Sequence, residues 1–415
     1  MNKNNKPKAP ELRFPSFTDD WEQRELKDIS KRVQHNDGRM NLPTLTISAS
    51  VGWLDQKDRF SGNIAGKELR NYTLLKKRQM SYNHGNSKVA KYGTVFCLKN
   101  YEEALVPRVY HSFEMTKDGY PEFIECIFAT RKPDRELGML VSSGARMDGL
   151  LNISYDSFMS IKIQVPSVQE QQKIASFFER IEKIITLHQR KLDTLKTLKK
   201  GLLQKMFPKD GCKVPELRFK GFTDDWEQCK FSDHVETRRG LTYKPSDVCV
   251  NGIRVLRSSN INEDSYLSKE DDIFVNEDAV KIPYAKNGDI LITSANGSSR
   301  LVGKHAIIRG IADNSAVHGG FMILASSKNP YFYNASMSSN WYKNFIKLFS
   351  MGGNGAIGNL SKNDLDKQII RIPSNAEQNK IGDLFKQYDS IITLHQRKLD
   401  SMKELKKGLL QKMFI

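Results

Sequence analysis

The ten residues IITLHQRKLD stand at positions 184–193, and the same ten residues return at positions 391–400. The nine residues KKGLLQKMF at 199–207 also return unchanged, at 406–414, with the same offset of 207. Identity of this length within one chain indicates an internal duplication. The period is far longer than that of solenoid repeats, which run from about 20 to 50 residues. We therefore expect two copies of one large unit, each ending in the repeated block.

A second pair of shared segments opens each copy. PELRF followed by FTDDWEQ occurs within residues 10–23 and again within residues 215–228. The stretches between the shared ends have almost no resemblance to each other. The alternation predicts four segments: a first variable domain at 1–166, a constant helix at 167–209, a second variable domain at 210–373 and a second constant helix at 374–415.

Each constant segment opens with a helix-start signal. Ser167 is followed three residues later by Glu170, and Ser374 by Glu377. A serine hydroxyl and a glutamate at this spacing can satisfy each other's unpaired backbone N–H groups, an arrangement known as a capping box. Both helices should therefore begin at these serines.

The apolar residues of both segments repeat every seven positions, which is the pattern of a helix that packs along a partner helix. A second apolar row widens the stripe. We expect the two helices to pair antiparallel about a pseudo-twofold axis, and packing of each helix on its own variable domain is the alternative. The predicted helix-pair seam consists of Ile174, Ile181, His188, Leu195, Leu202, Ile381, Tyr388, His395, Met402 and Leu409. The second row consists of Phe178, Ile185, Leu192, Met206, Phe385, Ile392, Leu399 and Met413.

Two polar or small positions interrupt this stripe in both copies. His188 and His395 have no Cys, Asp or Glu at metal-ligand spacing, so we interpret them as residues that fix the register of the pair and not as ligands. Gly201 and Gly408 weaken a helix by about 1 kcal/mol relative to alanine. We expect these glycines to mark a bend or a close approach of another backbone.

Composition sets the broad class of protein. The chain has 415 residues, of which 39% are hydrophobic, enough for two cores of ordinary size. Its net charge of +17 favours a polyanionic partner, although a solvated lysine-rich helix face gives part of the same signal. Five cysteines form no C-x-x-C pair, which favours a reducing compartment. The first residues lack an apolar signal segment and no run is long enough to span a membrane, so we expect a cytoplasmic protein without membrane association.

The variable domains combine short apolar runs with short helical stretches. Runs at 44–48, 94–98, 289–293 and 321–325 are bounded by Gly, Asn and Ser, as strands are. The predicted fold class is mixed α/β (α+β), with two globular domains separated by two long, antiparallel, coiled-coil-like helices.

Three polar stretches are candidates for contact with DNA: residues 78–88, 257–260 and 294–300. Arginine suits guanine, asparagine suits adenine, and small residues allow close approach to phosphate. Ordinary surface loops have a similar composition, which is the alternative. The candidate residues are Arg78, Tyr82, Asn83, His84, Asn86, Lys88, Arg257, Ser258, Asn260, Ser294, Asn296, Ser298 and Arg300.

The chain holds apparent catalytic motifs that lack their context. GNGAIG at 353–358 matches a dinucleotide-binding pattern, but a helix and not a strand is expected before it. Asn-Pro-Tyr at 329–331 lacks the second proline of an adenine methyltransferase motif. The paired aspartates at 19–20 and 224–225 sit beside a tryptophan in each entry segment, where a structural role is expected. We predict no catalytic residue and no metal site.

The combination of these features resembles the specificity subunit of type I restriction-modification systems. PELRFPSFTDDWEQ and PELRFKGFTDDWEQ correspond to the entries of two target-recognition domains. The segments ending HQRKLDTLKTLKKGLLQKMF and HQRKLDSMKELKKGLLQKMF correspond to two conserved spacer helices. The resemblance covers essentially the whole chain.

The resemblance implies a non-catalytic subunit that reads a bipartite site in double-stranded DNA, one half-site per domain. It also implies two modification subunits and two restriction subunits as partners. S-adenosylmethionine, ATP and Mg would then belong to those partners, and this chain would bind no cofactor. A structural scaffold that binds proteins through its variable domains is the main alternative, and a chain that itself cuts or methylates DNA is a further one.

Overall fold

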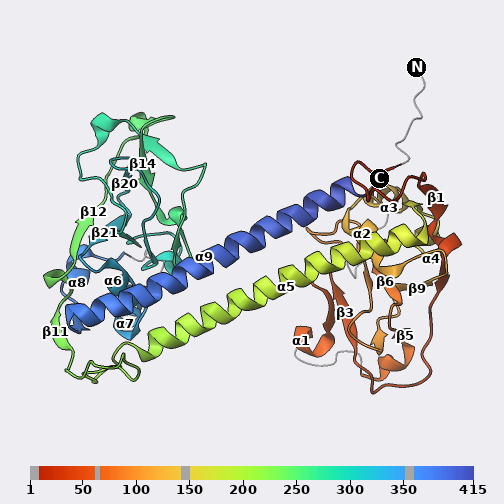
Figure 1. Ribbon diagram of the computed structural model, residues 1–415, viewed down its shortest axis with the longest axis horizontal. Helices are drawn as coiled ribbons and strands as arrows, with labels where there is room; N and C mark the ends of the chain where they lie inside the picture. Colours follow the sequence, from red (N-terminus) through yellow and green to blue (C-terminus); the bar gives the residue numbers. More distant parts are fainter. Residues whose placement is uncertain (1–8, 61–65, 142–149, 351–358) are drawn as a thin grey trace. The chain divides into compact units, whose positions relative to one another are not determined.

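The computed structural model describes residues 9–60, 66–141, 150–350 and 359–415. The chain forms two compact units (Figure 1). Unit 1 comprises residues 1–188 and 398–415, and unit 2 comprises residues 189–397. Each unit therefore contains one variable domain and a part of each long helix. The motif at 353–358 lies outside the described residues.

Unit 1 contains a four-stranded antiparallel sheet and three two-stranded strand pairs. The four-stranded sheet has the order β2-β9-β6-β7, and the pairs are β1-β10, β3-β4 and β5-β8. The strands are β1 (Glu22–Glu25), β2 (Ser30–Arg32), β3 (Leu45–Ser48), β4 (Gly52–Asp55), β5 (Thr73–Lys76), β6 (Met80–Asn83), β7 (Thr94–Cys97), β8 (Glu103–Val106), β9 (His111–Met115) and β10 (Lys162–Val165). The helices are α1 (Gln56–Phe60), α2 (Pro121–Ala129), α3 (Asp134–Leu140) and α4 (Tyr155–Met159).

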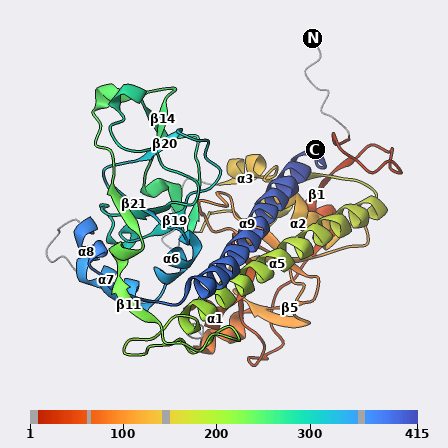
Figure 2. The ribbon, with the colours of Figure 1, turned by 60° about the vertical axis from the view of Figure 1, so that its left-hand side comes forward.

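Unit 2 contains a four-stranded antiparallel sheet of order β12-β21-β18-β19 and a second, mixed sheet of order β13-β17-β14-β20. Figure 2 shows α6 and α7 close to the first of these sheets. The strands are β11 (Glu227–Lys230), β12 (Glu236–Arg239), β13 (Val248–Cys249), β14 (Ile253–Leu256), β15 (Ile261–Asn262), β16 (Ser265–Tyr266), β17 (Ile273–Val275), β18 (Ile290–Thr293), β19 (His305–Ile307), β20 (Ala316–His318), β21 (Met322–Ser326) and β22 (Ile369–Ile372). The helices are α6 (Pro330–Ser336), α7 (Asn340–Ser350) and α8 (Lys362–Asp366).

The four-stranded antiparallel sheets of the two variable domains have the same strand order although their sequences differ. In unit 1, Met80 on β6 lies between Phe113 and Cys97. In unit 2, Ile290 on β18 lies between Ala325 and Ile307. The duplication therefore includes the variable domains and not only their constant ends.

The ends of each variable domain lie side by side. β1 pairs antiparallel with β10, so Glu22 faces Val165, and β11 pairs with β22 in the same way. A helix or 3-10 turn and the four-stranded sheet follow the entry strand in both domains. Each variable domain is thus a closed insertion whose entry and exit strands form one ribbon.

The constant segments are two continuous helices, α5 (Val168–Lys205) and α9 (Asn375–Lys412). In unit 1, Lys406 pairs with Glu182, and the rings of Phe414 and Phe178 are 6.0 Å apart. As residue numbers rise along α5 they fall along α9, so the helices run antiparallel there. In unit 2, Lys199 pairs with Asp389 and Phe207 contacts Phe385, again in antiparallel order. Figures 1 and 2 show the two helices side by side.

The expected fold class is confirmed: mixed α/β, two domains and two long helices that pack on each other. All ten predicted seam residues are buried or half-buried. In the second row, seven of the eight residues are buried and only Ile392 is half-buried. The second row is thus the more deeply enclosed of the two.

Two local expectations about the helices require correction. Ser167 Oγ does accept from the backbone N–H of Glu170, at 3.4 Å, but both carboxylate oxygens of Glu170 accept from Arg13. The expectation that another backbone approaches Gly201 and Gly408 closely is wrong, because a β-carbon added to either residue meets nothing within 4 Å. Both helices also continue through these glycines.

The tryptophans of the two entry segments anchor the helix ends. In unit 1, Trp21 packs on Phe123 and on Phe414, the residue that follows the end of α9 by two positions. In unit 2, Trp226 packs on Phe207, just after α5, and on Phe332. The repeated KMF of each constant block therefore ends inside a domain core.

Candidate nucleic-acid interface

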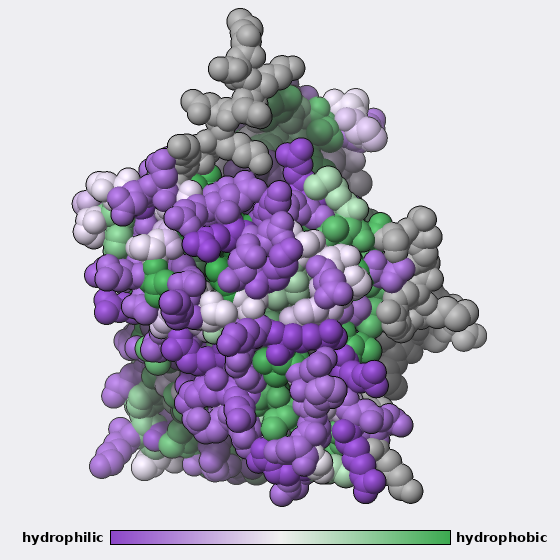
Figure 3. Space-filling model, turned by 90° about the vertical axis from the view of Figure 1, so that its right-hand side faces the viewer, coloured by the Kyte–Doolittle hydropathy of each residue, from purple (hydrophilic) through white to green (hydrophobic). Residues whose placement is uncertain are grey.

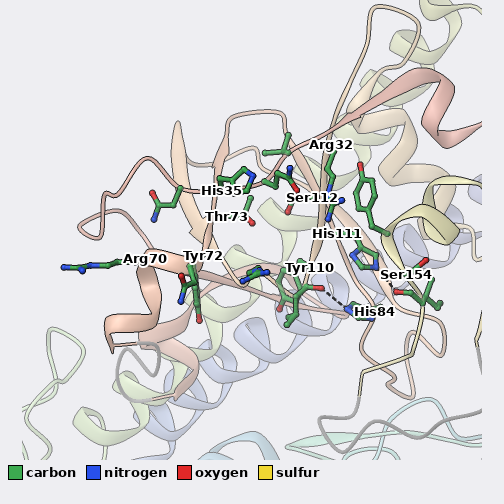
Figure 4. A pocket seen from close by; sticks show the side chains of 18 of the residues that line it. Arg32, His35, Arg70, Tyr72, Thr73, His84, Tyr110, His111, Ser112 and Ser154 are labelled. Carbon is green, nitrogen blue, oxygen red and sulfur yellow. Dashed lines mark hydrogen bonds between the residues drawn. The ribbon is translucent and has the colours of Figure 1, made fainter.

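A polar recess of about 590 Å³ lies in unit 1 where several strands end. Arg32 comes from the end of β2, His84 follows β6, and Arg108 precedes β9. Figure 4 shows Arg70 and Tyr72 on one side of the recess, and Arg32, His84, His111 and Ser154 on the other. Tyr110, Tyr155, Asn36, Asn71 and Asn152 also line it.

Three arginines supply the positive charge of this recess. Among the described residues, no carboxylate pairs with Arg32, Arg70 or Arg108. The Arg32 guanidinium instead lies over the Tyr155 ring, 4.1 Å from its centroid. Arginine stays protonated at all ordinary pH values and its planar fork matches phosphate oxygens. The recess therefore presents three permanent cations whose charge is available to an anionic ligand.

Two stacked histidines line one side of the recess. The His84 and His111 rings are stacked with centroids 4.8 Å apart. His84 Nδ1 lies 2.7 Å from Leu151 O and its Nε2 lies 2.8 Å from Val109 O, so the ring ties two loops together. Burial lowers the pKa of His111 to about 4, and its Nε2 donates to Ile153 O at 2.9 Å. His111 is therefore neutral near pH 7 and acts as a structural link.

One face of unit 1 is mostly hydrophilic. The face of unit 1 in Figure 3 is mostly polar, with small and separate hydrophobic patches. A protein-binding surface usually has an apolar centre, whereas nucleic-acid surfaces are polar and positively charged. The character of this face favours the second kind of partner.

The predicted stretch 78–88 does not form one surface. It contains strand β6, and Arg78 and His84 lie beyond opposite ends of that strand. Arg78 is held by Glu122 at 3.0 Å and lies over the Tyr120 ring. Of the stretch, only His84 lines the arginine recess.

Tyr82 is corrected from a contact residue to a core residue. Its side chain is 0% exposed, stacks on Phe158 with centroids 4.1 Å apart, and donates to Tyr92 O. Asn83 is half-buried and donates to Ile47 O, while Asn86 and Lys88 are exposed. This polar stretch contains strand β6, in which Met80, Ser81 and Tyr82 are all buried.

The two predicted stretches of unit 2 do come together. Asn296 Nδ2 donates to Ser258 Oγ at 3.0 Å, which joins 294–300 to 257–260. Ser298 and Arg300 are exposed and Arg257 is half-buried, with its Nη2 donating to Asp271 O. Ser294 is buried. These loops form one polar surface.

Asn260 is a second correction. It is fully buried, and its Nδ2 donates to Asp272 Oδ1 at 2.7 Å and to Leu267 O at 3.0 Å. Its Oδ1 accepts from the Arg257 backbone N–H. The amide nitrogen and the amide oxygen of this side chain both form hydrogen bonds within the loop, so neither is left for a ligand.

The recess arginines were missed from the sequence. Arg32 and Arg108 are single residues at strand ends, far apart in the chain and outside any Asn- or Ser-rich stretch. For Arg108 the available signal was its position two residues after the apolar strand β8, whereas Arg32 ends β2, whose sequence SKR is polar. That these two arginines lie close together could have been inferred only from the strand order.

Two further findings concern metal sites and membrane-spanning helices. Among the described residues, no group of three or more His, Cys, Asp or Glu side chains is placed to hold a metal ion. Within the same part of the chain, each helix is too short or too polar to cross a membrane.

Comparison with known proteins places these features in context. The family model described as type I restriction modification DNA specificity domain matches residues 18–197 and again 223–404. The type I restriction enzyme MjaVIII specificity subunit of Methanocaldococcus jannaschii is 22% identical over 282 residues, which cover 65% of this chain and 65% of that protein. A putative MjaX specificity subunit of the same organism is 22% identical over 274 residues, covering 62% of this chain and 60% of the relative. This chain thus spans somewhat less than two thirds of the length of either relative.

Solved structures share the fold. The S subunit of a type I restriction-modification system from M. genitalium has a TM-score of 0.64 and 15% identity, and the match covers 98% of this chain and 99% of that chain. A chain from a structure that concerns complex assembly and conformational transition of the type I R-M system has a TM-score of 0.50 and 13% identity, with coverage of 95% and 97%. At these identities the likeness concerns the fold alone.

Proposed function

Because this chain belongs to the family of type I restriction modification DNA specificity domains, we propose that it selects the DNA sequence on which a type I restriction-modification complex acts. The observation that carries the proposal is the arginine recess formed by Arg32, Arg70 and Arg108. Duplex DNA is the polyanion that such a set of unpaired cations fits, and phosphate contacts position a protein before base contacts specify a sequence.

The proposed target is bipartite and asymmetric. Two domains built on four-stranded sheets of the same strand order would approach DNA in the same manner, and their different loops would read different bases. If two domains meet successive faces of the major groove, they are separated by about one DNA turn, roughly 10 base pairs. The antiparallel helices would set the number of unread base pairs between the half-sites.

The helices offer two equivalent apolar patches for partner subunits. In unit 1, Ile184 and Leu187 of α5 and Leu405 of α9 are exposed. In unit 2, the residues at the corresponding repeat positions are exposed: Ile391 and Leu394 of α9, and Leu198 of α5. Two copies of one surface bind two copies of one partner, so we assign these patches to two modification subunits. Two restriction subunits would join the same complex.

Catalysis is assigned to those partners. S-adenosylmethionine, ATP and Mg would be bound by the modification and restriction subunits, and this chain would act as a non-catalytic reader. A scaffold that binds only proteins would have the same helices, but it would have no use for a recess at the strand ends with three arginines that pair with no carboxylate of the described residues.

Salt-dependent binding of the full chain to random duplex DNA tests the proposal. We expect the logarithm of affinity to fall steeply with the logarithm of salt concentration. The variants Arg32→Ala, Arg70→Ala and Arg108→Ala should each lower that slope by about 1 when a phosphate contact is lost. Arg24→Ala is the matched control, since Arg24 is an exposed arginine of the same unit that is paired with Glu22.

A flat salt dependence of the unaltered chain would contradict DNA binding and favour the scaffold. Equal slopes for the three recess variants and the Arg24 control would remove the recess from the interface. Mapping adenine methylation in cells that carry the chain with its modification subunits then identifies the target. A single continuous motif there would contradict the bipartite proposal.

A further inference from the structure

Phe321 is a large apolar side chain presented to solvent in unit 2. It lies directly before β21, after two glycines, and 73% of it is exposed. Single exposed apolar residues are common and need no explanation by themselves. The backbone that carries Phe321 and the side chains around it distinguish this residue from the others.

The backbone at Phe321 is held from several sides. Its carbonyl accepts from Ser294 N at 2.9 Å and from Ala295 N at 3.2 Å. The preceding Gly319 donates to Leu256 O at 2.9 Å, and its carbonyl accepts from Met322 N at 2.8 Å.

The segment that follows β12 crosses this turn so closely that only glycine fits at position 240. A β-carbon on Gly240 would lie 1.9 Å from Gly319 O, well below any permitted contact. Leu241 N also donates to His318 O at 2.7 Å. The Phe321 ring therefore projects from a fixed turn, and a ligand that covers it loses little entropy in ordering the backbone.

Polar groups suited to bases surround this turn. Ser294 and Ala295, which hold the Phe321 carbonyl, begin the loop that carries Asn296, and Asn296 donates to Ser258. The position of a β-carbon on Gly319 is 3.9 Å from Arg257 Cγ. The three stretches 257–260, 294–300 and 319–321 hold two arginines and no acidic residue. Such a surface is complementary to a polyanion.

Unit 1 has an apolar residue at the equivalent position. Tyr82 faces His111 as Ile292 faces Ile323, and Val109 and Phe321 each lie two residues before the second member of these pairs. The Val109 carbonyl is bound by His84, and the Phe321 carbonyl is bound by Ser294, the residue equivalent to His84. Val109 is 45% exposed and lines the arginine recess.

Resting on the proposed function, we propose that Phe321 is a wedge that packs against the bases of the half-site read by the second variable domain. Apolar side chains in protein–DNA complexes contact thymine methyl groups or enter between base steps, while neighbouring polar side chains bind base edges and phosphates. Val109 is the smaller counterpart for the first half-site. The aromatic ring, with more surface to bury, makes the stronger contribution.

The test uses the full chain with its modification subunits, expressed in a host without other adenine methylation. Methylated positions are mapped for the unaltered chain and for Phe321→Ala, Phe321→Leu, Val109→Ala and Val250→Ala. Val250 is the matched control, since it is an apolar residue of the same unit that is 89% exposed on another loop.

We expect Phe321→Ala to relax one or two base positions of one half-site and to reduce methylation of the original motif at least tenfold, with the other half-site unchanged. Phe321→Leu should retain most of the selectivity. Val109→Ala should act more weakly and on the opposite half-site, and Val250→Ala should have no effect. The melting temperature should not change for Phe321→Ala, because the ring is exposed.

An unchanged motif with Phe321→Ala overturns the wedge, and so does an equal loss at both half-sites. A lowered melting temperature also overturns it, because the ring would then be part of the folded core. If the unaltered chain gives no two-part motif, the proposed function fails and not the wedge alone. The unaltered chain therefore separates the two failures.

Discussion

Arg13 and Glu170 form a two-point ion pair that joins the entry segment of the first variable domain to the start of α5. Arg13 Nε donates to Glu170 Oε1 and Nη2 donates to Oε2, both at 2.7 Å. Arg218 and Glu377 form the same pair at 2.8 Å in the second copy. The hydrogen bond to Glu170 raises the pKa of Arg13 above its ordinary value. The shared PELRF and S-x-x-E motifs are thus two halves of one contact.

Removal of Arg13 should destabilise unit 1 strongly. The Glu170 side chain is 1% exposed, so Arg13→Ala leaves a buried carboxylate without its partner. Loss of one member of a buried pair costs about 3–5 kcal/mol, whereas an exposed pair contributes less than about 1 kcal/mol. Arg24→Ala, which breaks the exposed pair with Glu22, is the control. Denaturant unfolding measures both, and equal losses would contradict the assignment.

Alanine at Gly201 or Gly408 should stabilise the helices. Both glycines lie inside continuous helices with open space where a β-carbon would stand. Each substitution should add about 0.5–1 kcal/mol to the free energy of unfolding. Thermal unfolding of the chain alone gives the result. A drop in stability would show that these positions are more closely packed than the structure indicates.

A charged residue introduced into one exposed apolar patch should prevent the binding of one modification subunit. Leu187 is 63% exposed on α5 and Leu394 is 51% exposed on α9, at equivalent repeat positions. Leu187→Glu or Leu394→Glu should each leave a complex with one modification subunit, and the double variant should leave none. Thr186→Glu, at the exposed neighbouring position, serves as control. Native mass spectrometry counts the subunits, and two bound copies in the double variant would exclude the patches.

Low pH should reduce the folding stability of both variable domains because each contains a buried, neutral histidine. Burial lowers the pKa of His318 to about 4, and that of His111 is also about 4, against about 6.5 in an unfolded chain. His318 Nε2 donates to Arg238 O, and its Nδ1 has no described partner. The unfolded chain therefore binds protons that the folded chain excludes. Stability should be complete above pH 6.5 and should fall as pH drops toward 4.

The His318 contribution amounts to at most about 3 kcal/mol across that interval, since one pKa unit corresponds to about 1.4 kcal/mol. His318→Gln, which keeps a donor for Arg238 O, should flatten the dependence of unfolding free energy on pH in unit 2. Denaturant unfolding at pH 7, 6 and 5 measures the slope. An unchanged slope would contradict a neutral buried His318.

The sequence was most informative where a pattern was local and repeated. The seven-residue spacing predicted α5 and α9, and four apolar runs predicted β3, β7, β18 and β21. The shared strand arrangement of the variable domains was not predictable, because burial fixes only the apolar character of positions such as Met80 and Ile290. The candidate contact surface was harder to predict than the strand arrangement. Arg32 and Arg108 meet only through strand order, and Tyr82 was mistaken for a loop residue.

The pairing of β1 with β10, and of β11 with β22, has a consequence for how such a protein changes. Everything between residues 26 and 161 enters and leaves through one two-stranded ribbon, closed beneath by Arg13 and Glu170. We expect that a different sequence that begins and ends on this ribbon can take the place of the domain as one piece, provided that it keeps the contacts that Phe123 makes with Trp21 and with Phe414 at the end of α9.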